Sequence, residues 1–168
     1  FIGLHPQPEM EIWLSRAYNK WMQEKLLSAD DRIKFLAVLP YNTPEECERI
    51  VTETAGKKGI IGYAVPSTRH APVHHNKYMR LYRMIEETDM PISFHAGYHW
   101  DDPSLKTVNR FLGMHALGFA WPNIVHCTNW VLNGIPVRFP KLKVIWIESG
   151  IAWAPFLMQR LDDQFLRT

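Results

Sequence analysis

Apolar residues recur along the chain with two different spacings, and each spacing predicts a kind of element. Four short, mostly apolar runs are typical of buried strands: residues 32–40, 59–66, 91–95 and 142–149. Between and around these runs, apolar residues recur every three or four positions, which predicts amphipathic helices. The predicted helices cover residues 8–27, 43–55, 76–88, 104–117 and 124–135, and a last one begins at Ile151.

Two of these helices carry further sequence signals. The 43–55 helix has a start signal, with Thr43 as N-cap, Pro44 at the first helical position and Glu46 completing a capping box. Gly56 is expected to end it. In the 8–27 helix the amphipathic pattern rests on the apolar residues Met10, Ile12, Trp13, Ala17, Trp21 and Leu26.

The alternation of strands and helices predicts an α/β fold. Strands with few polar positions are expected where helices cover a parallel sheet. The pattern fits either a doubly wound sheet or part of a (β/α)8 TIM barrel, since four parallel strands are too few to close such a barrel. In both architectures ligands collect at the carboxyl ends of the strands.

Two strands end directly in an ionisable residue. His95 ends the run "PISFH", and Glu148 follows "KVIWI". A carboxylate there is costly to bury unless a charged group or a metal pairs with it, and imidazole is a common metal ligand and proton carrier. Each residue alone also fits a structural role, because His95 can be a hydrogen-bonded histidine and Glu148 can cap the next helix. Together they predict one site at the carboxyl edge of the sheet.

Composition narrows the possible classes of protein. The chain has 168 residues, 46% of them apolar, which suits a single domain. A formal charge of +2 argues against an obligatory nucleic-acid or membrane-surface partner. Cys47 and Cys127 form neither a disulfide framework nor a zinc motif, so we expect a reduced, cytoplasmic protein. No run reaches the ~18 apolar residues of a transmembrane helix.

Several catalytic motifs are absent, and both ends of the chain look cut. The sequence contains no HExxH, CxxC, GxSxG or glycine-rich phosphate loop, which argues against the hydrolases and nucleotide-binding folds that use them. It begins without Met, and its last residues, "LDDQFLRT", continue a helical pattern. We therefore expect a fragment of a longer chain.

The block "GIPVRFPKLKVIWIESGIAWAPFLMQRLD" (134–162) resembles a known family. It is similar to the amidohydrolase-related family of metal-dependent hydrolases and decarboxylases, which includes aminocarboxymuconate-semialdehyde decarboxylase and resorcylate decarboxylase. The segments "PISFHAG", "DRIKFLAVLPYNTPEE" and "RAYNKW" extend the likeness over most of the chain. The resemblance implies a partial (β/α)8 barrel in which this chain holds family strands three to six.

The resemblance also implies roles for individual residues. The family metal is usually zinc, and His95 occupies the position of its strand-five ligand; the other ligands would lie outside this chain. Many members carry a catalytic histidine where this chain has Glu148, which could be a general base, a metal ligand or the mark of different chemistry. Arg69 is a candidate to pair with an anionic substrate, and Trp100 and Trp153 are candidates to wall its pocket.

The leading hypothesis is a metal-dependent hydrolase or decarboxylase acting on a small carboxylated molecule, with aromatic carboxylates among the candidates. The expected partner is therefore a small-molecule carboxylate. The choice between hydrolysis and decarboxylation stays open, as does a homo-oligomeric state. Two alternatives remain. The chain could be a non-catalytic α/β domain with a structural His95 and Glu148, or a truncated barrel that is inactive although its parent is an enzyme.

Overall fold

Four parallel strands form one sheet in the part of the chain that the computed structural model describes, which is residues 5, 7–66, 71–95 and 102–167. In the sheet they lie in chain order, β1-β2-β3-β4. A doubly wound sheet reverses its strand order at a switch point, whereas a barrel adds each strand on the same side. The unreversed order therefore confirms the α/β, partial-barrel prediction. The strands are β1 (Phe35–Val38), β2 (Ile60–Pro66), β3 (Ile92–His95) and β4 (Val144–Ile147).

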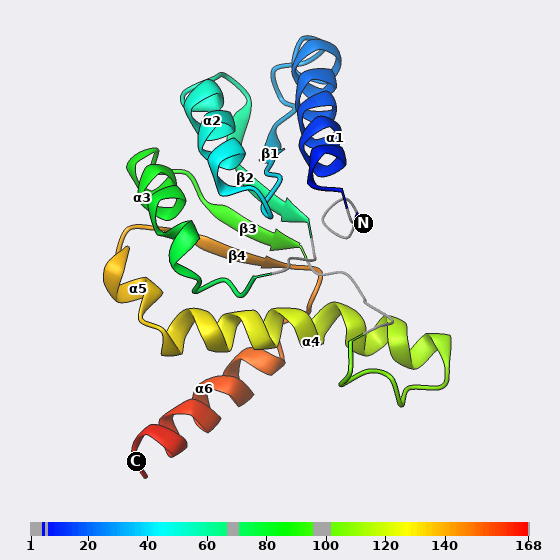
Figure 1. The fold of residues 1–168 in the computed structure, drawn as a ribbon, viewed down its shortest axis with the longest axis vertical. Coiled ribbons are helices and arrows are strands. Elements are labelled where there is room, and N and C mark those ends of the chain that lie inside the picture. The colour runs from blue at the N-terminus through cyan, green and yellow to red at the C-terminus, as the bar shows by residue number, and fades with distance from the viewer. Residues whose placement is uncertain (1–4, 6, 67–70, 96–101, 168) are drawn as a thin grey trace.

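Helices connect the strands and lie beside the sheet (Figure 1). α2 and α3 lie together on one side, α1 lies beside β1, and α6 extends away from the sheet. No helix in the described ranges is both long enough and apolar enough to cross a bilayer. The α-helices are α1 (Pro8–Trp21), α2 (Pro44–Thr54), α3 (Met79–Glu87), α4 (Phe111–Leu132), α5 (Ile135–Arg138) and α6 (Trp153–Phe165). Two short helical turns are the π-helical η2 (Met22–Leu26) and the 3-10 turn η3 (Asn76–Tyr78).

The core lies around β1 to β3 and is rich in aromatic rings. Phe94 of β3 is fully buried among aromatic rings. It stacks on Trp146 at 5.1 Å between centroids and meets Tyr41 and Trp130 edge-on at 5.8 and 5.7 Å. Burying such a ring contributes roughly 1.5–3 kcal/mol, with a further contribution from each aromatic pair. The backbone just before His95 is therefore held firmly.

The α1 helix packs with the opposite face to the one its apolar residues suggest. An amphipathic helix usually turns its apolar stripe to the core. Here Met10, Trp13 and Trp21 are exposed, and the buried residues of α1 are instead Glu11, Ser15 and Asn19. Asn19 explains part of this, because its side chain donates to Val38 O at 2.9 Å and accepts from Val38 N at 2.8 Å.

The capping box predicted at the start of α2 does not form. Thr43 is the N-cap residue and Pro44 begins the helix, but the Thr43 side chain makes no capping hydrogen bond. The Glu46 carboxylate is turned away to two guanidinium groups, those of Arg16 on α1 and Arg49 on α2. A carboxylate gains more from two positively charged guanidinium groups than from one uncharged backbone N–H, so Glu46 ties α2 to α1 instead.

The two helices predicted over 104–117 and 124–135 are one helix that starts later, so their helical character is confirmed for most residues but the predicted start and break are wrong. Residues 102–110 form turns, and one continuous helix, α4, runs through Pro122. A proline inside a helix removes one main-chain hydrogen bond and its ring crowds the carbonyl four residues earlier, at a cost of about 3 kcal/mol. Burial of Met114, Asn123 and Trp130 along α4 outweighs that loss, because most helical stability in proteins comes from packing.

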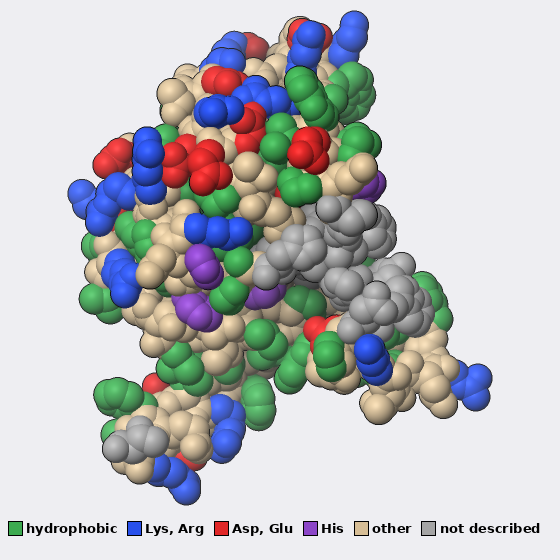
Figure 2. Space-filling view, viewed as in Figure 1, with side chains coloured by type: hydrophobic (Ala, Val, Ile, Leu, Met, Phe, Trp, Pro, Cys, Tyr) green, Lys and Arg blue, Asp and Glu red, His purple; other side chains and the backbone are tan. Residues whose placement is uncertain are grey.

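Apolar side chains reach the surface on the helices before and after β4. Figure 2 shows them around α4 and α6, at the lower end of the view. None of the described residues of α6 is buried, whereas α2 and α3 contribute several residues to the core. The large exposed residues of this region include Ile151, Phe156, Met158, Phe165 and Leu166.

Candidate functional site

The sheet brings the two predicted site residues together at its carboxyl edge. β3 and β4 are neighbours, and His95 lies opposite Ile147 in their parallel register, so Glu148 follows one residue beyond the last pair. The His95 Nε2 atom lies 3.4 Å from Glu148 Oε2. Both side chains are about half exposed, at 46% and 55%, so they remain accessible to a small molecule or an ion.

Glu148 has a backbone conformation that non-glycine residues rarely adopt. Its φ is +63°, in the left-handed region, and Gly150 two residues later has a φ of +66°. A non-glycine residue held there costs roughly 1–3 kcal/mol and persists where surrounding contacts require it. Ser149 between them is buried, with 8% exposure. The sharp turn after β4 therefore fixes the Glu148 side chain next to His95.

The donor atoms at this edge suit a divalent cation. An imidazole nitrogen and a carboxylate oxygen both ligate zinc and manganese. Within the described residues, no group of three or more His, Cys, Asp or Glu side chains could hold a metal ion. His95 and Glu148 therefore fit as two members of a ligand set, and the described part of the chain does not supply a complete one.

A model of the family described as amidohydrolase matches residues 8–168, which is nearly the whole chain. The chain belongs to the amidohydrolase family. This confirms the family resemblance that was based on the 134–162 block. No curated protein matches the sequence.

Solved structures of decarboxylases share the fold of this amidohydrolase chain. A 2,6-dihydroxybenzoate decarboxylase complexed with 2,6-dihydroxybenzoate is 19% identical, with a TM-score of 0.77 over 95% of this chain and 51% of that one. A dihydroxybenzoic acid decarboxylase from Polaromonas sp. JS666, with bound manganese and the inhibitor 2-nitroresorcinol, is 18% identical (TM-score 0.73; 85% and 46%). The 5-carboxyvanillate decarboxylase from Sphingomonas paucimobilis is 17% identical (TM-score 0.67; 85% and 43%). The chain spans about half the length of these structures.

The three residues predicted to bind substrate are not brought to the His95–Glu148 pair by the described structure. Arg69 and Trp100 lie outside the described residues. Trp153 begins α6 and lines an apolar groove of about 510 Å³ at the open side of β4, together with Trp146 of that strand. His95 and Glu148, both described, do not line this groove.

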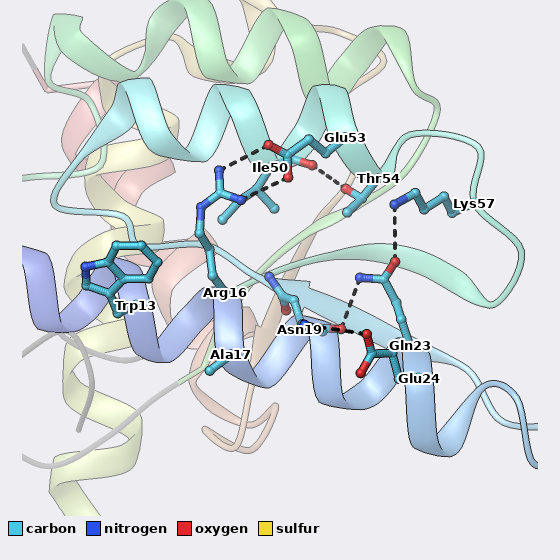
Figure 3. A pocket seen from close by; sticks show the side chains of 11 residues that line it. Trp13, Arg16, Ala17, Asn19, Gln23, Glu24, Ile50, Glu53, Thr54 and Lys57 are labelled. Carbon is cyan, nitrogen blue, oxygen red and sulfur yellow. Dashed lines mark hydrogen bonds and ion pairs between the residues drawn. The ribbon is translucent and has the colours of Figure 1, made fainter.

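The groove between α1 and α2 is of similar size, about 560 Å³, but its charged groups bind one another (Figure 3). Arg16 makes two hydrogen bonds to Glu53, at 3.0 and 3.1 Å, and this pairing holds the pKa of the Glu53 carboxyl below its usual range. Lys57 donates to Gln23 at 3.3 Å. The groove lies in the outer helix layer, and it is better explained as a junction between helices than as a reaction site.

One ionisable residue near a strand end was missed by the sequence analysis. Glu11 on α1 is buried, with 2% exposure, beside Tyr41 and Asn42, which follow β1. Burial raises the pKa of its carboxyl to about 7, although hydrogen bonds from Asn42 and from the Tyr41 backbone and the charge of Lys77 lower it. The sequence offered one signal, an acidic residue between the apolar residues Met10 and Ile12.

Proposed function

We propose that the protein carrying this chain is a metal-dependent decarboxylase or hydrolase that acts on a small carboxylated aromatic compound. The observation that carries the proposal is the His95–Glu148 pair, 3.4 Å apart at the carboxyl edge of a parallel sheet. Membership of the amidohydrolase family supports it. The decarboxylases that share the fold support the choice of substrate class, since one holds 2,6-dihydroxybenzoate and another manganese with 2-nitroresorcinol.

His95 is proposed as a ligand of the cation, through Nε2, the nitrogen that faces Glu148. A divalent ion bound there, zinc in the first instance, would supply Lewis-acid chemistry by polarising a substrate oxygen and lowering the pKa of water towards ~7. Glu148 has two proposed roles. As a ligand, its carboxylate is close enough to His95 to bind the same ion. As an acid or base, it is about half exposed and can exchange a proton with a bound substrate.

The substrate-binding residues are proposed from the sequence. Arg69 follows β2 in the chain and would pair its guanidinium with the substrate carboxylate, a geometry in which arginine can donate two parallel hydrogen bonds. Trp100, five residues after His95, would contact the aromatic ring. Trp153 is left out of this set, because it lines a groove that neither His95 nor Glu148 lines.

Metal content tests the assignment. The purified protein carrying this chain is analysed for bound zinc and manganese, alongside H95A, E148Q and the control H75A, which removes an exposed histidine from the loop before η3. We expect about one divalent ion per chain in the wild type and H75A and its loss in H95A. An ion-free wild type, or an H95A variant that keeps its ion as H75A does, would contradict the proposal.

The role of Glu148 follows from E148Q in the same experiment. Loss of the ion assigns Glu148 to the ligand set, and retention of the ion with loss of CO₂ release from 2,6-dihydroxybenzoate assigns it to proton transfer. The alternatives predict other outcomes. A non-catalytic α/β domain would bind no ion while folded, and a truncated barrel would be inactive as the 168-residue chain but active within a longer one.

A further inference from the structure

Asn123, in the middle of α4, makes contacts that neither the family resemblance nor the sequence pattern suggests. It is fully buried, with 0% exposure. Its side-chain Nδ2 donates to the main-chain oxygen of Ile147 at 3.0 Å, to Ser149 Oγ at 3.2 Å and to the main-chain oxygen of Phe94 at 3.4 Å. One amide group thus joins the carboxyl end of β3 to the carboxyl end of β4.

The positions of these acceptors give the contacts a specific consequence. Phe94 and Ile147 are the residues directly before His95 and Glu148. Ser149 is the residue directly after Glu148, inside the turn that holds Glu148 at a φ of +63°. Asn123 therefore bonds to the backbone directly before His95 and directly before Glu148, and to the side-chain hydroxyl of the residue directly after Glu148. These contacts lie at the level where the β3–β4 ladder ends.

The orientation of the amide is fixed by its neighbours. All three partners accept hydrogen bonds and share the two N–H groups of the amide, so the NH₂ group must face them. A flipped amide would point its oxygen at two carbonyl oxygens. In the described structure the Asn123 Oδ1 atom is buried and has no hydrogen-bond partner. Leaving a buried oxygen unpaired is unfavourable. Among the described residues, the hydrogen bonds of the Asn123 side chain are therefore those of its NH₂ group.

We propose that Asn123 is a positioning residue that sets the separation of His95 and Glu148 by bridging the backbone on which both are carried. For its effect on ion binding this rests on the proposed function. Groups that orient metal ligands without touching the metal commonly change metal affinity 10–100-fold when removed. Asn123 would act in that way through two strands at once.

The chain offers a matched control in Asn19. It too is a buried helix asparagine that hydrogen bonds to a strand, with Nδ2 donating to Val38 O at 2.9 Å, but that strand is β1, which carries neither site residue. Asn123→Leu and Asn19→Leu each replace a buried amide by an apolar group of similar volume. Asn123→Ser removes the amide with less steric change and carries the test if Asn123→Leu fails to fold.

The test measures Mn²⁺ affinity by calorimetry, and amide hydrogen exchange without metal, on the protein carrying this chain. In the Asn123 variants we expect affinity at least tenfold weaker and faster exchange in peptides covering β3 and residues 144–149. Asn19→Leu should keep wild-type affinity and show faster exchange around β1 only. Equal Mn²⁺ affinities in the Asn123 and Asn19 variants would overturn the positioning role while leaving the metal site in place.

A wild type that binds no Mn²⁺ or Zn²⁺ would instead overturn the proposed function. In that case amide hydrogen exchange without metal is the measurement that tests the role of Asn123. Faster exchange at the ends of β3 and β4 in the Asn123 variants, but not in Asn19→Leu, would support the bridge. The same exchange in both variants would refute it.

Discussion

At the scale of single residues, Glu11 shows how burial overrides favourable contacts. The carboxyl receives hydrogen bonds from Asn42 and from the Tyr41 backbone and lies within the field of Lys77, all of which favour its charged form. The effect of desolvation is larger than that of these contacts together, and the pKa of the Glu11 carboxyl rises to about 7. Its Oε2 atom has no hydrogen-bond partner among the described residues, which is consistent with a carboxyl that is easily protonated.

Glu11 therefore makes stability depend on pH near neutrality. The unfolded carboxyl titrates at its ordinary 4.5, and the folded one at about 7. Between these values the folded state keeps a proton that the unfolded state has lost, so the free energy of unfolding falls as the pH rises, by about 3 kcal/mol in all. Urea unfolding between about pH 5 and about pH 8 should show a shallower slope in Glu11→Gln.

The matched control for that slope is Glu9→Gln, which removes an exposed carboxylate two residues earlier in α1. We expect it to retain the wild-type pH dependence. If Glu11→Gln and the wild type lost stability in parallel across the same range, the carboxyl would be ionised at its ordinary pKa and the effect of burial would be refuted.

At the scale of elements, the sequence predicted the strands better than the helices. Each strand is a short run of mostly apolar residues, so β1 to β4 could be recognised from composition alone, although β4 is only partly buried. The helix pattern shows which residues share a face but not which face meets the sheet. In α1 the sheet faces Asn19, because Asn19 satisfies both the N–H and the C=O of Val38.

The candidate site was predictable for a related reason. A histidine or glutamate that ends an apolar strand is visible in the sequence, and parallel strands bring such ends to one edge. That β3 and β4 are neighbours, and that His95 and Glu148 therefore meet at 3.4 Å, depends on strand order. Asn123 could not be found in this way, because its role depends on α4 continuing through Pro122 and crossing both strand ends.

The reversed face of α1 leads to an unusual pair of expectations. Met22, directly after the helix, is 7% exposed within the core, whereas its neighbour Trp21 is 51% exposed. We expect Met22→Ala to lower the free energy of unfolding by about 2–5 kcal/mol and Trp21→Ala by about 0.5 kcal/mol, although tryptophan is the larger residue. Urea unfolding of both variants measures this. A larger loss for Trp21→Ala would mean that the apolar stripe of α1 is buried after all.

At the scale of the whole molecule, the β1 edge and the β4 edge of the sheet are covered unequally. On the β1 side, Asn19 occupies the outward N–H and C=O of Val38, and α2 and α3 supply fully buried residues such as Cys47 and Leu81. On the β4 side, the strand is only partly buried, and the groove beside it is lined by apolar residues of α4 and α6. Stability should therefore be distributed unevenly along the chain.

Two leucine truncations test this asymmetry. Leu81 on α3 is fully buried, and Leu157 on α6 is only partly buried and lines the groove beside β4. Removing Leu81 leaves a cavity in close-packed surroundings, so we expect Leu81→Ala to lower the free energy of unfolding by about 2–5 kcal/mol. Leu157→Ala loses a side chain already in contact with solvent and should cost about 1 kcal/mol or less. Equal losses in urea unfolding would show that α6 is packed as tightly as α3, and a loss confined to Leu81→Ala would place the cooperative core at β1 to β3.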